Sequence, residues 1–462
     1  MAKEYYQSPR WSGEIADCGM PMTMDTYSNC AFGCAYCFSQ YQRGVGKPSA
    51  DYNQHANVKH VNVEAVKKIF LELDNPRNQF AEYIRQRKVL QWGGLSDQFD
   101  PVEKKLRVTY ELLKFFREIE YPISFSTKAT WFMDDPEYIE LFQGAHFWNI
   151  KWSIVTLDRN KSKRLEKGVP SPMDRIKAIE KFAKMGNPAT LRLRPFMIGI
   201  STPDYPELIK ISADHGATAL TTEFFCLEQR ATKPKHLKNY ALISELCGFD
   251  VLAYYKKYST GSGYLRLNRN IKRIYVAHMK RVAKENGMRF AVSDAHFKEE
   301  SDNGACCALP SDWAYSQGQW TEALMIAKKD GEVRFSQMAE KMGNLFDFMW
   351  NYATSFNTGS VSRRQKYKRM SMKEYLRSVW NDPNNGQSPY KMFEGIVKPK
   401  MVGNSDGSTD VFRDENRDIV YFYNPEKGLN LDTMSELLRS QDSVKLPDSN
   451  QIPCGMRGPD NL

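Results

Sequence analysis

The feature that most constrains the fold is a regular alternation of strand-like and helix-like segments over residues 22–225. Strand-like runs occur at 22–26, 88–92, 122–127, 148–155, 191–198 and 217–225, and helical spacing separates them at 62–73, 104–118, 134–143, 171–186 and 205–215. Six such repeats predict parallel strands joined by right-handed crossovers. We therefore predict an α/β fold, a partial or full (β/α) TIM-like barrel. Its functional residues should lie on loops at the C-terminal ends of the strands.

The alternation weakens after residue 225, and the chain divides there. Two strand-like runs around Gly261, Ser262 and Gly263 predict a hairpin at 254–268, followed by a basic helix at 271–285 and a short strand at 290–292. Helical patterns near 320–355 and 371–380, with a hairpin in 410–423, predict an α-rich accessory region. The predicted organisation is an N-terminal extension (1–20), a barrel that includes the basic hairpin (21–298), an accessory domain (299–440) and a flexible polar tail (441–462).

Composition limits the class of protein. The 462 residues are enough for one large domain and an accessory domain, and 41% apolar residues can build a sizeable core. No apolar run is long enough to span a membrane, and residues 1–20 lack a signal-peptide pattern. Nine cysteines, an odd number, do not indicate a disulfide framework. We therefore expect a cytoplasmic protein without a membrane partner.

Three cysteines lie close together in the loop that follows the first predicted strand. Cys30, Cys34 and Cys37 fall within eight residues, and the aromatic residue Phe38 follows at once. Three thiolates can hold three irons of a four-iron cubane and leave the fourth iron open for chemistry. The alternatives are a zinc knuckle or three unrelated buried cysteines. A structural zinc site needs a fourth Cys or His, and the next His and Cys are His55 and Cys226.

A second distinctive stretch, Gly93 to Glu103, comes directly after the second predicted strand. Its Gly93-Gly94 pair would let the backbone approach a ligand closely, although a tight turn would also explain it. The third predicted strand runs into Lys128, whose ammonium group suits a carboxylate. On the fifth strand, Arg192 and Arg194 alternate inward, and an inward arginine needs an anion to be tolerated.

Together these motifs resemble the radical S-adenosylmethionine (SAM) superfamily. Within that superfamily, residues 20–225 are similar to the spore photoproduct lyase branch. The similarity lies in the order of three motifs: Ser96-Asp97 with Phe99 and Pro101, then Ser126-Thr127-Lys128, then Arg164-Leu165-Glu166. The resemblance implies a 4Fe-4S cluster and SAM as cofactors, an external one-electron reductant, and formation of a 5′-deoxyadenosyl radical.

The resemblance also implies roles for individual residues. Cys30, Cys34 and Cys37 would bind the cluster. The resemblance places beside SAM the residues Phe38, Gly93, Gly94, Ser96, Asp97, Lys128 and Ser153. Arg194, an inward arginine of the fifth strand, is also predicted to bind SAM.

One residue departs from the photoproduct lyase pattern. Those enzymes carry a hydrogen-donating cysteine at the position that Gly94 occupies here, and glycine has no thiol. Dimer repair by that route is therefore disfavoured. Isomerisation or modification of a thymine-derived base, similar to phage-encoded enzymes that rearrange hypermodified thymines in DNA, fits better; the protein would then work in the host cytoplasm.

Three other cysteines could supply a thiol. Cys226 ends the sixth predicted strand, and Cys306-Cys307 follows the last one in a glycine-containing loop. A substitute thiol donor, redox chemistry or an auxiliary iron–sulfur cluster would each need such residues. Burial as structural cysteines is the plainer alternative, because free cysteine is among the most buried residue types.

The net charge of +10 is concentrated in two zones. Residues 256–290 hold ten Lys or Arg and one acid, and residues 361–400 hold ten and three. In the predicted hairpin, basic and aromatic side chains are interleaved, which suits phosphates and stacked bases. A solvated, lysine-rich face is the alternative. The residues predicted to contact DNA are Lys256, Lys257, Tyr258, Tyr264, Arg266 and Arg269.

The sequence thus predicts a radical SAM enzyme, of the isomerase or lyase type, that acts on a thymine-derived base in DNA. Three alternatives stay open: photoproduct lyase-like repair, radical chemistry on a peptide or small molecule, and a non-enzymatic, metal-stabilised nucleic-acid-binding protein.

Overall fold

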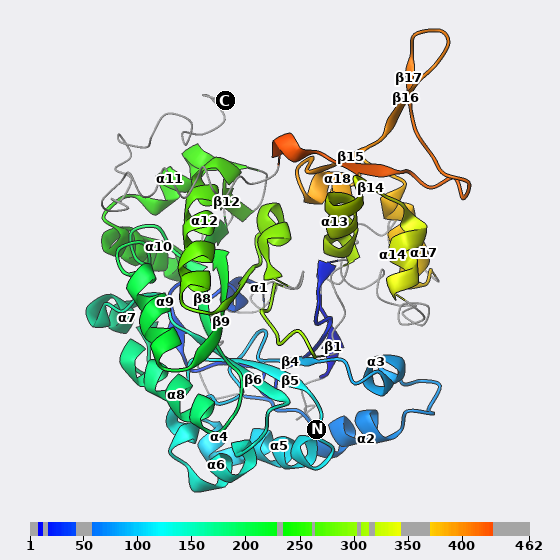
Figure 1. Ribbon diagram of the computed structural model, residues 1–462. Coiled ribbons are helices and arrows are strands. Elements are labelled where there is room, and N and C mark those ends of the chain that lie inside the picture. The colour runs from blue at the N-terminus through cyan, green and yellow to red at the C-terminus, as the bar shows by residue number, and fades with distance from the viewer. Residues whose placement is uncertain are drawn as a thin grey trace.

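The computed structural model describes residues 8–12, 17–42, 58–228, 234–260, 264–302, 306–313, 319–342 and 370–427. An eight-stranded sheet in the order β1-β2-β4-β5-β6-β8-β9-β13 forms its centre (Figure 1). The strands are β1 (Arg10–Trp11), β2 (Met22–Met24), β4 (Leu90–Trp92), β5 (Ile123–Thr127), β6 (Trp148–Ser153), β8 (Ala189–Phe196), β9 (Ala217–Phe224) and β13 (Arg289–Val292).

Seven strands of this sheet are parallel, from β2 to β13, and β1 adds to β2 in the antiparallel direction. Within the described residues β1 and β13 form the two edges, so the sheet is a partial barrel and is not closed. The predicted α/β barrel is confirmed in its partial form. Residues 10–11 of the predicted extension form the edge strand.

Helices return the chain between strands and cover the outside of the sheet. They are α1 (Ser39–Gln42), α2 (Val63–Leu71), α3 (Ala81–Arg85), α4 (Glu103–Leu106), α5 (Val108–Glu118), η3 (Trp131–Met133), α6 (Pro136–Phe142), α7 (Arg159–Leu165), α8 (Pro172–Lys184) and α9 (Tyr205–Asp214). Helix α8 begins at Ser171 and Pro172, as its sequence predicts, and a capping box between Ser171 and Asp174 closes its first turn. The single helix expected at 104–118 is two helices, because Arg107 takes a left-handed conformation (φ 54°).

The two faces of the sheet differ in polarity. On β6, Trp148 and Trp152 face the helices, where Trp152 lies 5.6 Å from Phe182 between ring centroids. The alternate residues Lys151 and Ser153 therefore face the barrel interior. This alternation gives the barrel an aromatic outer layer and a polar inner face.

The predicted hairpin at 254–268 is wrong over its first half. Residues 251–258 form helix α11 (Val251–Tyr258), which begins at Asp250, and Tyr254, Tyr255 and Tyr258 are buried in the core. Only β11 (Ser259–Thr260) and β12 (Tyr264–Leu267) pair as an antiparallel hairpin, and β10 (Cys226–Glu228) joins them. Aromatic residues at i, i+1 and i+4 fit one buried helix face, and this helical spacing overrides their strand propensity.

Residues 319–342 and 370–427 form a smaller α+β unit beside β1 (Figure 1). Three further helices precede this unit in the chain: α10 (Pro234–Cys247), α12 (Arg269–Glu285) and η4 (Ala295–Glu300). The unit consists of α13 (Gln319–Asp330), β14 (Glu332–Val333), α14 (Phe335–Met342), α17 (Met372–Trp380), α18 (Pro389–Met392), β15 (Val397–Pro399), β16 (Met401–Gly403), β17 (Thr409–Val411), β18 (Tyr421–Tyr423) and η7 (Pro425–Lys427). The expected hairpin within 410–423 is confirmed only at its centre, where Arg413 and Ile419 pair in the antiparallel direction around a turn. The strands on either side pair elsewhere: β17 pairs with β16, and β18 lies between β14 and β15.

None of the helices that the structure describes is both long and apolar enough to cross a membrane. The predicted tail 441–462 lies outside the described residues.

Candidate active site

The cysteine loop leaves the C-terminal end of β2 and is fastened on both sides. Strand β3 (Gly33–Cys34) pairs with β7 (Glu166–Lys167), and the Ala35 amide donates to the Leu165 carbonyl (2.8 Å). The Ala31 amide donates to the Asp100 carboxylate (2.5 Å). The loop backbone is therefore held by two distant parts of the barrel.

The donor set of this loop fits a cubane cluster. Cys30 and Cys34 are buried, Cys37 is half-buried, and none of the three is in a disulfide. Burial raises the pKa of the Cys34 thiol to about 12, although Lys128 opposes this shift. The positive charge of a bound iron would therefore be needed to deprotonate this thiol. Among the described residues, no three His, Cys, Asp or Glu side chains are grouped to hold a metal ion. Thiolates of a cubane bind different irons, so they need not converge on one point.

A fully buried ion pair joins the cysteine loop to β6. Glu166 accepts hydrogen bonds from the Tyr36 hydroxyl and from Arg175 Nη2 (2.6 Å). Arg175 also donates to the Ser153 carbonyl (2.5 Å) and to Ser162 Oγ (3.0 Å). Burial raises the pKa of Glu166, but Arg175 and Lys128 outweigh it and the net pKa shift is downward, as expected for a carboxylate that stays ionised. Tyr36, between two cluster cysteines, is thereby fixed to the end of β6.

A second buried carboxylate fixes the start of the loop. Glu103 accepts hydrogen bonds from the hydroxyls of Tyr27 and Tyr138 and from the amides of Thr109 (2.9 Å) and Tyr110 (2.8 Å). Tyr27 lies three residues before Cys30, so Glu103 ties the entrance of the cysteine loop to α5.

The glycine pair after β4 forms a turn that requires one of its glycines. Gly93 has φ +88°, and a Cβ there would lie 2.2 Å from Gln98 Oε1 and 2.6 Å from the Ser126 carbonyl oxygen. Gly94 has no such strain, and a Cβ there would lie 3.2 Å from Thr23 Oγ1. The two buried side-chain polar atoms of Gln98 have no hydrogen-bond partner among the described residues. Close backbone approach and unused polar atoms fit a ligand cradle at this turn.

Two predicted SAM contacts in this turn have structural partners. Ser96 Oγ donates to the Tyr27 carbonyl (2.6 Å). The Asp97 carboxylate accepts from Thr127 Oγ1 (2.8 Å) and from the amides of Lys128 (2.8 Å) and Phe99 (3.0 Å). Burial raises the pKa of Asp97 to about 6, against these hydrogen bonds. Both residues connect β2, β4 and β5, and a direct contact with SAM stays a prediction.

The remaining predicted cofactor residues surround the same end of the barrel. Lys128 Nζ lies 5.6 Å from the Tyr36 ring centroid, and Ser153 Oγ accepts from Arg192 Nη1 (3.0 Å). Phe38 is 39% exposed, which leaves its ring free to cover a ligand. Arg194 is paired with Glu223 and donates to Ser293 Oγ (3.2 Å). Arg192, rather than Arg194, therefore contacts a predicted SAM residue.

The three additional thiols are all half-buried. Cys226 begins β10 rather than ending the sixth strand, and burial raises the pKa of its thiol to about 11. The Sγ atoms of Cys306 and Cys307 lie 3.8 Å apart, and the Cys306 carbonyl accepts from Thr221 Oγ1 (2.8 Å) on β9. Their roles as thiol donors or auxiliary ligands stay predictions.

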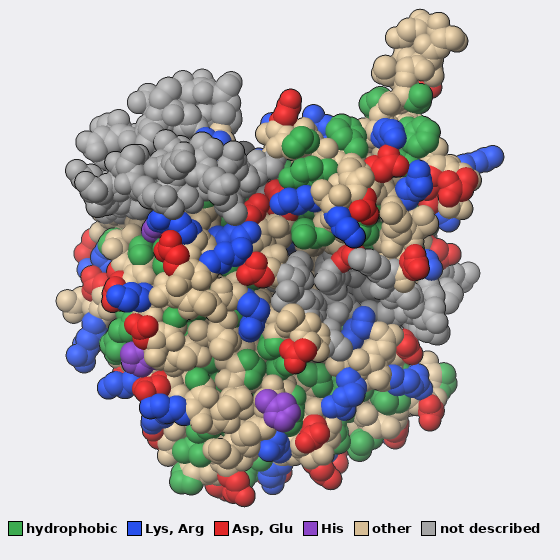
Figure 2. Space-filling model, in the orientation of Figure 1, with side chains coloured by type: hydrophobic (Ala, Val, Ile, Leu, Met, Phe, Trp, Pro, Cys, Tyr) green, Lys and Arg blue, Asp and Glu red, His purple; other side chains and the backbone are tan. Residues whose placement is uncertain are grey.

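The predicted DNA contacts differ in their exposure to solvent. Tyr258 is 1% exposed, so its ring is unavailable for stacking on a base, and that prediction is wrong because α11 packs it into the core. Lys256, Lys257 and Arg266 are exposed, and the Arg266 guanidinium lies 5.5 Å from the half-buried Tyr264 ring centroid. Arg269 is half-buried over Phe297 (5.6 Å). In the second basic zone, residues 361–369 lie outside the described residues, and Tyr375 and Trp380 are buried. On the face in Figure 2, basic and acidic side chains are intermixed.

Sequence reasoning missed Lys151 and the role of Glu166 as an anchor of Tyr36. Lys151 is 3% exposed and faces the barrel interior one inward position below Ser153. A lysine between the apolar residues Ile150 and Trp152 was the available signal.

Comparison with known proteins gives one family match and several structures of low similarity. Residues 24–210 match the family model of the radical SAM superfamily. A cysteine variant of spore photoproduct lyase is 17% identical with a TM-score of 0.43, over 62% of this chain and 80% of that one. Spore photoproduct lyase complexed with dinucleoside spore photoproduct is 16% identical (TM-score 0.42; 62% and 80%). SuiB of Streptococcus suis bound to S-adenosylmethionine is 13% identical (TM-score 0.36; 61% and 52%). No curated protein matches.

Residues 24–210 therefore match a radical SAM domain, and they lie on a partial (β/α) barrel. The matched family implies a 4Fe-4S cluster and SAM as cofactors and an enzymatic function.

Proposed function

We propose that this radical SAM enzyme modifies or isomerises a thymine-derived base in DNA. The observation that carries the enzymatic part is the three-thiol loop, which two buried carboxylates hold at the C-terminal ends of the parallel strands. When bound, the cluster and SAM supply a 5′-deoxyadenosyl radical, after an external one-electron donor has reduced the cluster.

The residues around the loop would bind and orient these cofactors. Cys30, Cys34 and Cys37 would hold three irons and leave one open. Lys128, at the end of β5, would bind the SAM carboxylate, and Ser153 would hydrogen-bond near it. The Gly93 turn would let the backbone approach the methionyl part, and Phe38 would cover the adenosyl group. The buried aromatic layer outside the sheet would help to keep water from the reacting atoms.

The substrate class rests on two sequence features and one surface. Gly94 carries no thiol, which disfavours hydrogen return by the photoproduct lyase route and favours an isomerisation or modification. Lys256, Lys257 and Arg266 with Tyr264 are accessible for contact with phosphates and bases. A base in DNA would have to leave the stack to enter the barrel.

Anaerobic reconstitution with iron and sulfide tests the enzymatic part. With SAM and a strong one-electron reductant, we expect formation of 5′-deoxyadenosine and about four irons per chain. Cys34→Ala should lose both the visible iron–sulfur absorption and 5′-deoxyadenosine, whereas Cys247→Ala, a buried cysteine on α10, should keep them. About eight irons per chain would support an auxiliary cluster involving Cys306 and Cys307.

Nucleoside mass spectrometry tests the substrate. The reconstituted enzyme is incubated with unmodified DNA and with DNA that contains thymines bearing extended substituents, and a mass-neutral isomer or a new nucleoside is the expected product. If 5′-deoxyadenosine forms but no nucleoside changes and DNA does not bind, the peptide or small-molecule alternative replaces this proposal.

A further inference from the structure

Two adjacent thiols lie on the inner side of the sheet, and the proposed reaction uses neither of them. The Sγ atoms of Cys306 and Cys307 are 3.8 Å apart, so one thiol can donate a hydrogen bond to the other. Both side chains are half-buried, and neither is in a disulfide. The pair is therefore a reduced dithiol that keeps part of its surface open to small molecules.

The segment that carries the two cysteines is held inside the barrel. The Cys306 carbonyl accepts from Thr221 Oγ1 (2.8 Å) on β9. Thr221 is the register partner of Arg192 on the parallel strand β8, so both side chains face the interior. Ala308 packs on small residues of β9 and β13, and Leu309 packs beside the starts of β2 and β4. The segment thus runs along the inner side of the sheet, and the dithiol sits on it.

Lys151 of β6 supplies a positive charge beside the dithiol. This lysine is 3% exposed and faces the same interior. Among the described residues, Cys307 is the opposite charge that acts on it most strongly. A buried ammonium group is stabilised by a nearby anion, and a buried thiolate by a nearby cation. Lys151 and Cys307 therefore stabilise each other's charged forms.

The two thiols differ in acidity. The hydrogen bond from Cys306, assisted by Lys151, lowers the pKa of Cys307 to about 7. The same hydrogen bond raises the pKa of Cys306. Because the thiolate is the nucleophile, Cys307 is the residue that attacks first, whereas Cys306 keeps its proton until the second step.

A bond between these two sulfur atoms would be easily reduced. The Cα atoms of adjacent residues are about 3.8 Å apart, whereas those of ordinary disulfides are roughly 4.4–6.8 Å apart. A disulfide closed between neighbours is therefore strained, and strain makes the bond more reducible. Labile disulfides of this kind serve redox chemistry, whereas structural disulfides resist reduction.

We infer that Cys306 and Cys307 are a redox-active dithiol that exchanges two electrons with a low-molecular-weight disulfide. The Cys307 thiolate attacks one sulfur of that disulfide, forms a mixed disulfide and releases one thiolate. Cys306 then attacks the Cys307 sulfur, closes the Cys306–Cys307 bond and releases the second thiolate. The protein loses two electrons, the small disulfide gains them, and the proton of Cys306 passes to one of the released thiolates.

Oxidation has a direct electrostatic consequence, because closing the bond removes the thiolate beside Lys151. The redox state of the pair therefore changes the charge inside the barrel. This inference does not depend on the identity of the proposed DNA substrate.

The test follows one tryptic peptide of the reconstituted enzyme. Peptide 299–328 contains Cys306 and Cys307 and no other cysteine, whereas peptide 11–43 contains Cys18 and the three cluster cysteines. The enzyme is equilibrated anaerobically with mixtures of reduced and oxidised glutathione, and remaining thiols are blocked with iodoacetamide before digestion and mass spectrometry. With oxidised glutathione in excess, we expect peptide 299–328 to lose two hydrogens and take up no alkyl group. Dithiothreitol should restore alkylation of both cysteines.

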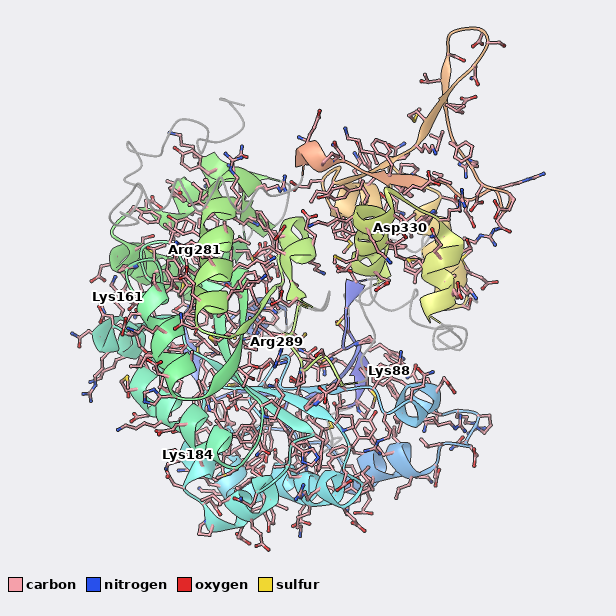
Figure 3. All side chains as sticks on the ribbon, in the orientation of Figure 1. Lys88, Lys161, Lys184, Arg281, Arg289 and Asp330 are labelled. Carbon is pink, nitrogen blue, oxygen red and sulfur yellow. The ribbon has the colours of Figure 1, made fainter. Side chains whose placement is uncertain are left out.

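Variants separate the roles of the two thiols and of the lysine. Cys306→Ser should accumulate a mixed disulfide between Cys307 and glutathione, whereas Cys307→Ser should form neither bond. Lys151→Met should slow the alkylation of Cys307 at pH 7 by about fivefold or more, because the thiolate loses its cation. Lys184→Met is the matched control: this exposed lysine of α8, labelled in Figure 3, should leave the rate unchanged.

Alkylation of both cysteines in peptide 299–328 at every glutathione ratio would overturn the inference. A disulfide that links this peptide to peptide 11–43 would overturn it too, because Cys18 or a cluster cysteine would then be the partner. Equal alkylation rates in wild type and Lys151→Met would overturn the role of the lysine. Iron content and 5′-deoxyadenosine formation, measured on the same preparation, report separately on the proposed function.

Discussion

At the scale of single residues, adjacent glycines have different roles. The backbone of Gly93 is left-handed (φ +88°) and packed against Gln98 and Ser126, whereas Gly94 has ordinary backbone geometry beside Thr23. Only the first is required by the fold. Under the proposed function, the second corresponds to the thiol position of the photoproduct lyases, so its lack of a side chain would concern chemistry rather than folding.

Alanine substitutions should separate these roles. Gly93→Ala combines an unfavourable φ with contacts below 3 Å and should lower the free energy of unfolding by at least about 2 kcal/mol. Gly94→Ala meets only Thr23 Oγ1 at 3.2 Å and should cost less than about 1 kcal/mol. Urea denaturation of the two variants measures the difference, and equal losses would contradict this assignment.

His278 on α12 should make stability depend on pH. It hydrogen-bonds Tyr205, and burial, assisted by Arg281, lowers its pKa from 6.5 to about 4. Because the unfolded chain binds this proton first as pH falls, the stabilisation is complete above pH 6.5 and is lost between pH 6.5 and 4.

Because the side chain is partly exposed, solvent screening reduces the effect. We expect this histidine to account for about 2 kcal/mol of the fall in the free energy of unfolding between pH 6.5 and pH 4. His278→Gln should remove this component of the pH dependence. Urea denaturation of both proteins at pH 7 and pH 5 measures it, and parallel losses in both would exclude His278 as the cause.

At the scale of elements, the buried pair between β7 and α8 holds the cysteine loop. Both Glu166 and Arg175 have fully buried side chains, and Tyr36 joins them from the loop. One short strand thereby positions the cysteines relative to Ser153.

Glu166→Gln would leave the Arg175 charge buried and unpaired, and should cost about 3–5 kcal/mol of stability. It should also speed the loss of iron to a chelator, because Tyr36 loses its anchor. The exposed pair between Arg164 of α7 and Glu245 of α10 is the control: Arg164→Ala should cost no more than about 1 kcal/mol of stability and leave iron release unchanged. Similar iron release by both variants would show that the pair does not hold the loop.

At the scale of the whole molecule, one buried aspartate joins three parts of the chain. Asp17, before β2, accepts hydrogen bonds from Lys298 of η4 and from the amide (2.8 Å) and hydroxyl (2.7 Å) of Thr321 on α13. Glu299 extends the connection to Lys328 (3.5 Å) and Tyr423 (3.1 Å) in the accessory unit. These contacts fasten the accessory unit to the side of β1 (Figure 1).

Asp17→Ala would leave Lys298 buried without the carboxylate of Asp17. We expect the free energy of unfolding to fall by about 3–5 kcal/mol. The accessory unit should then be cleaved by a protease at lower denaturant concentration than the barrel. Asp330→Ala, an exposed residue at the end of α13 labelled in Figure 3, is the control. Simultaneous cleavage of both units in Asp17→Ala would indicate that other contacts hold them together.

The sequence alone determined the parallel barrel and the cysteine loop, because both depend on local information. Strand–helix periodicity and right-handed crossovers fix the order of the strands, and three thiols within eight residues must share one loop. Prediction from the sequence failed for Tyr254, Tyr255 and Tyr258. Their aromatic character favours a strand, whereas this segment packs against the core as a helix. The sequence also could not place β18, because strand pairing depends on partners far apart in the chain.

Tertiary structure alone decided which charges meet. Glu166 and Arg175 pair, Asp17 and Lys298 pair across more than half the chain, and Lys151 faces the interior with Arg192. Charge–charge energies depend on distance and burial, neither of which is encoded in local sequence. The cysteine loop therefore predicted the class of reaction from sequence, whereas the buried ion pairs that hold this loop in place emerged only from the folded chain.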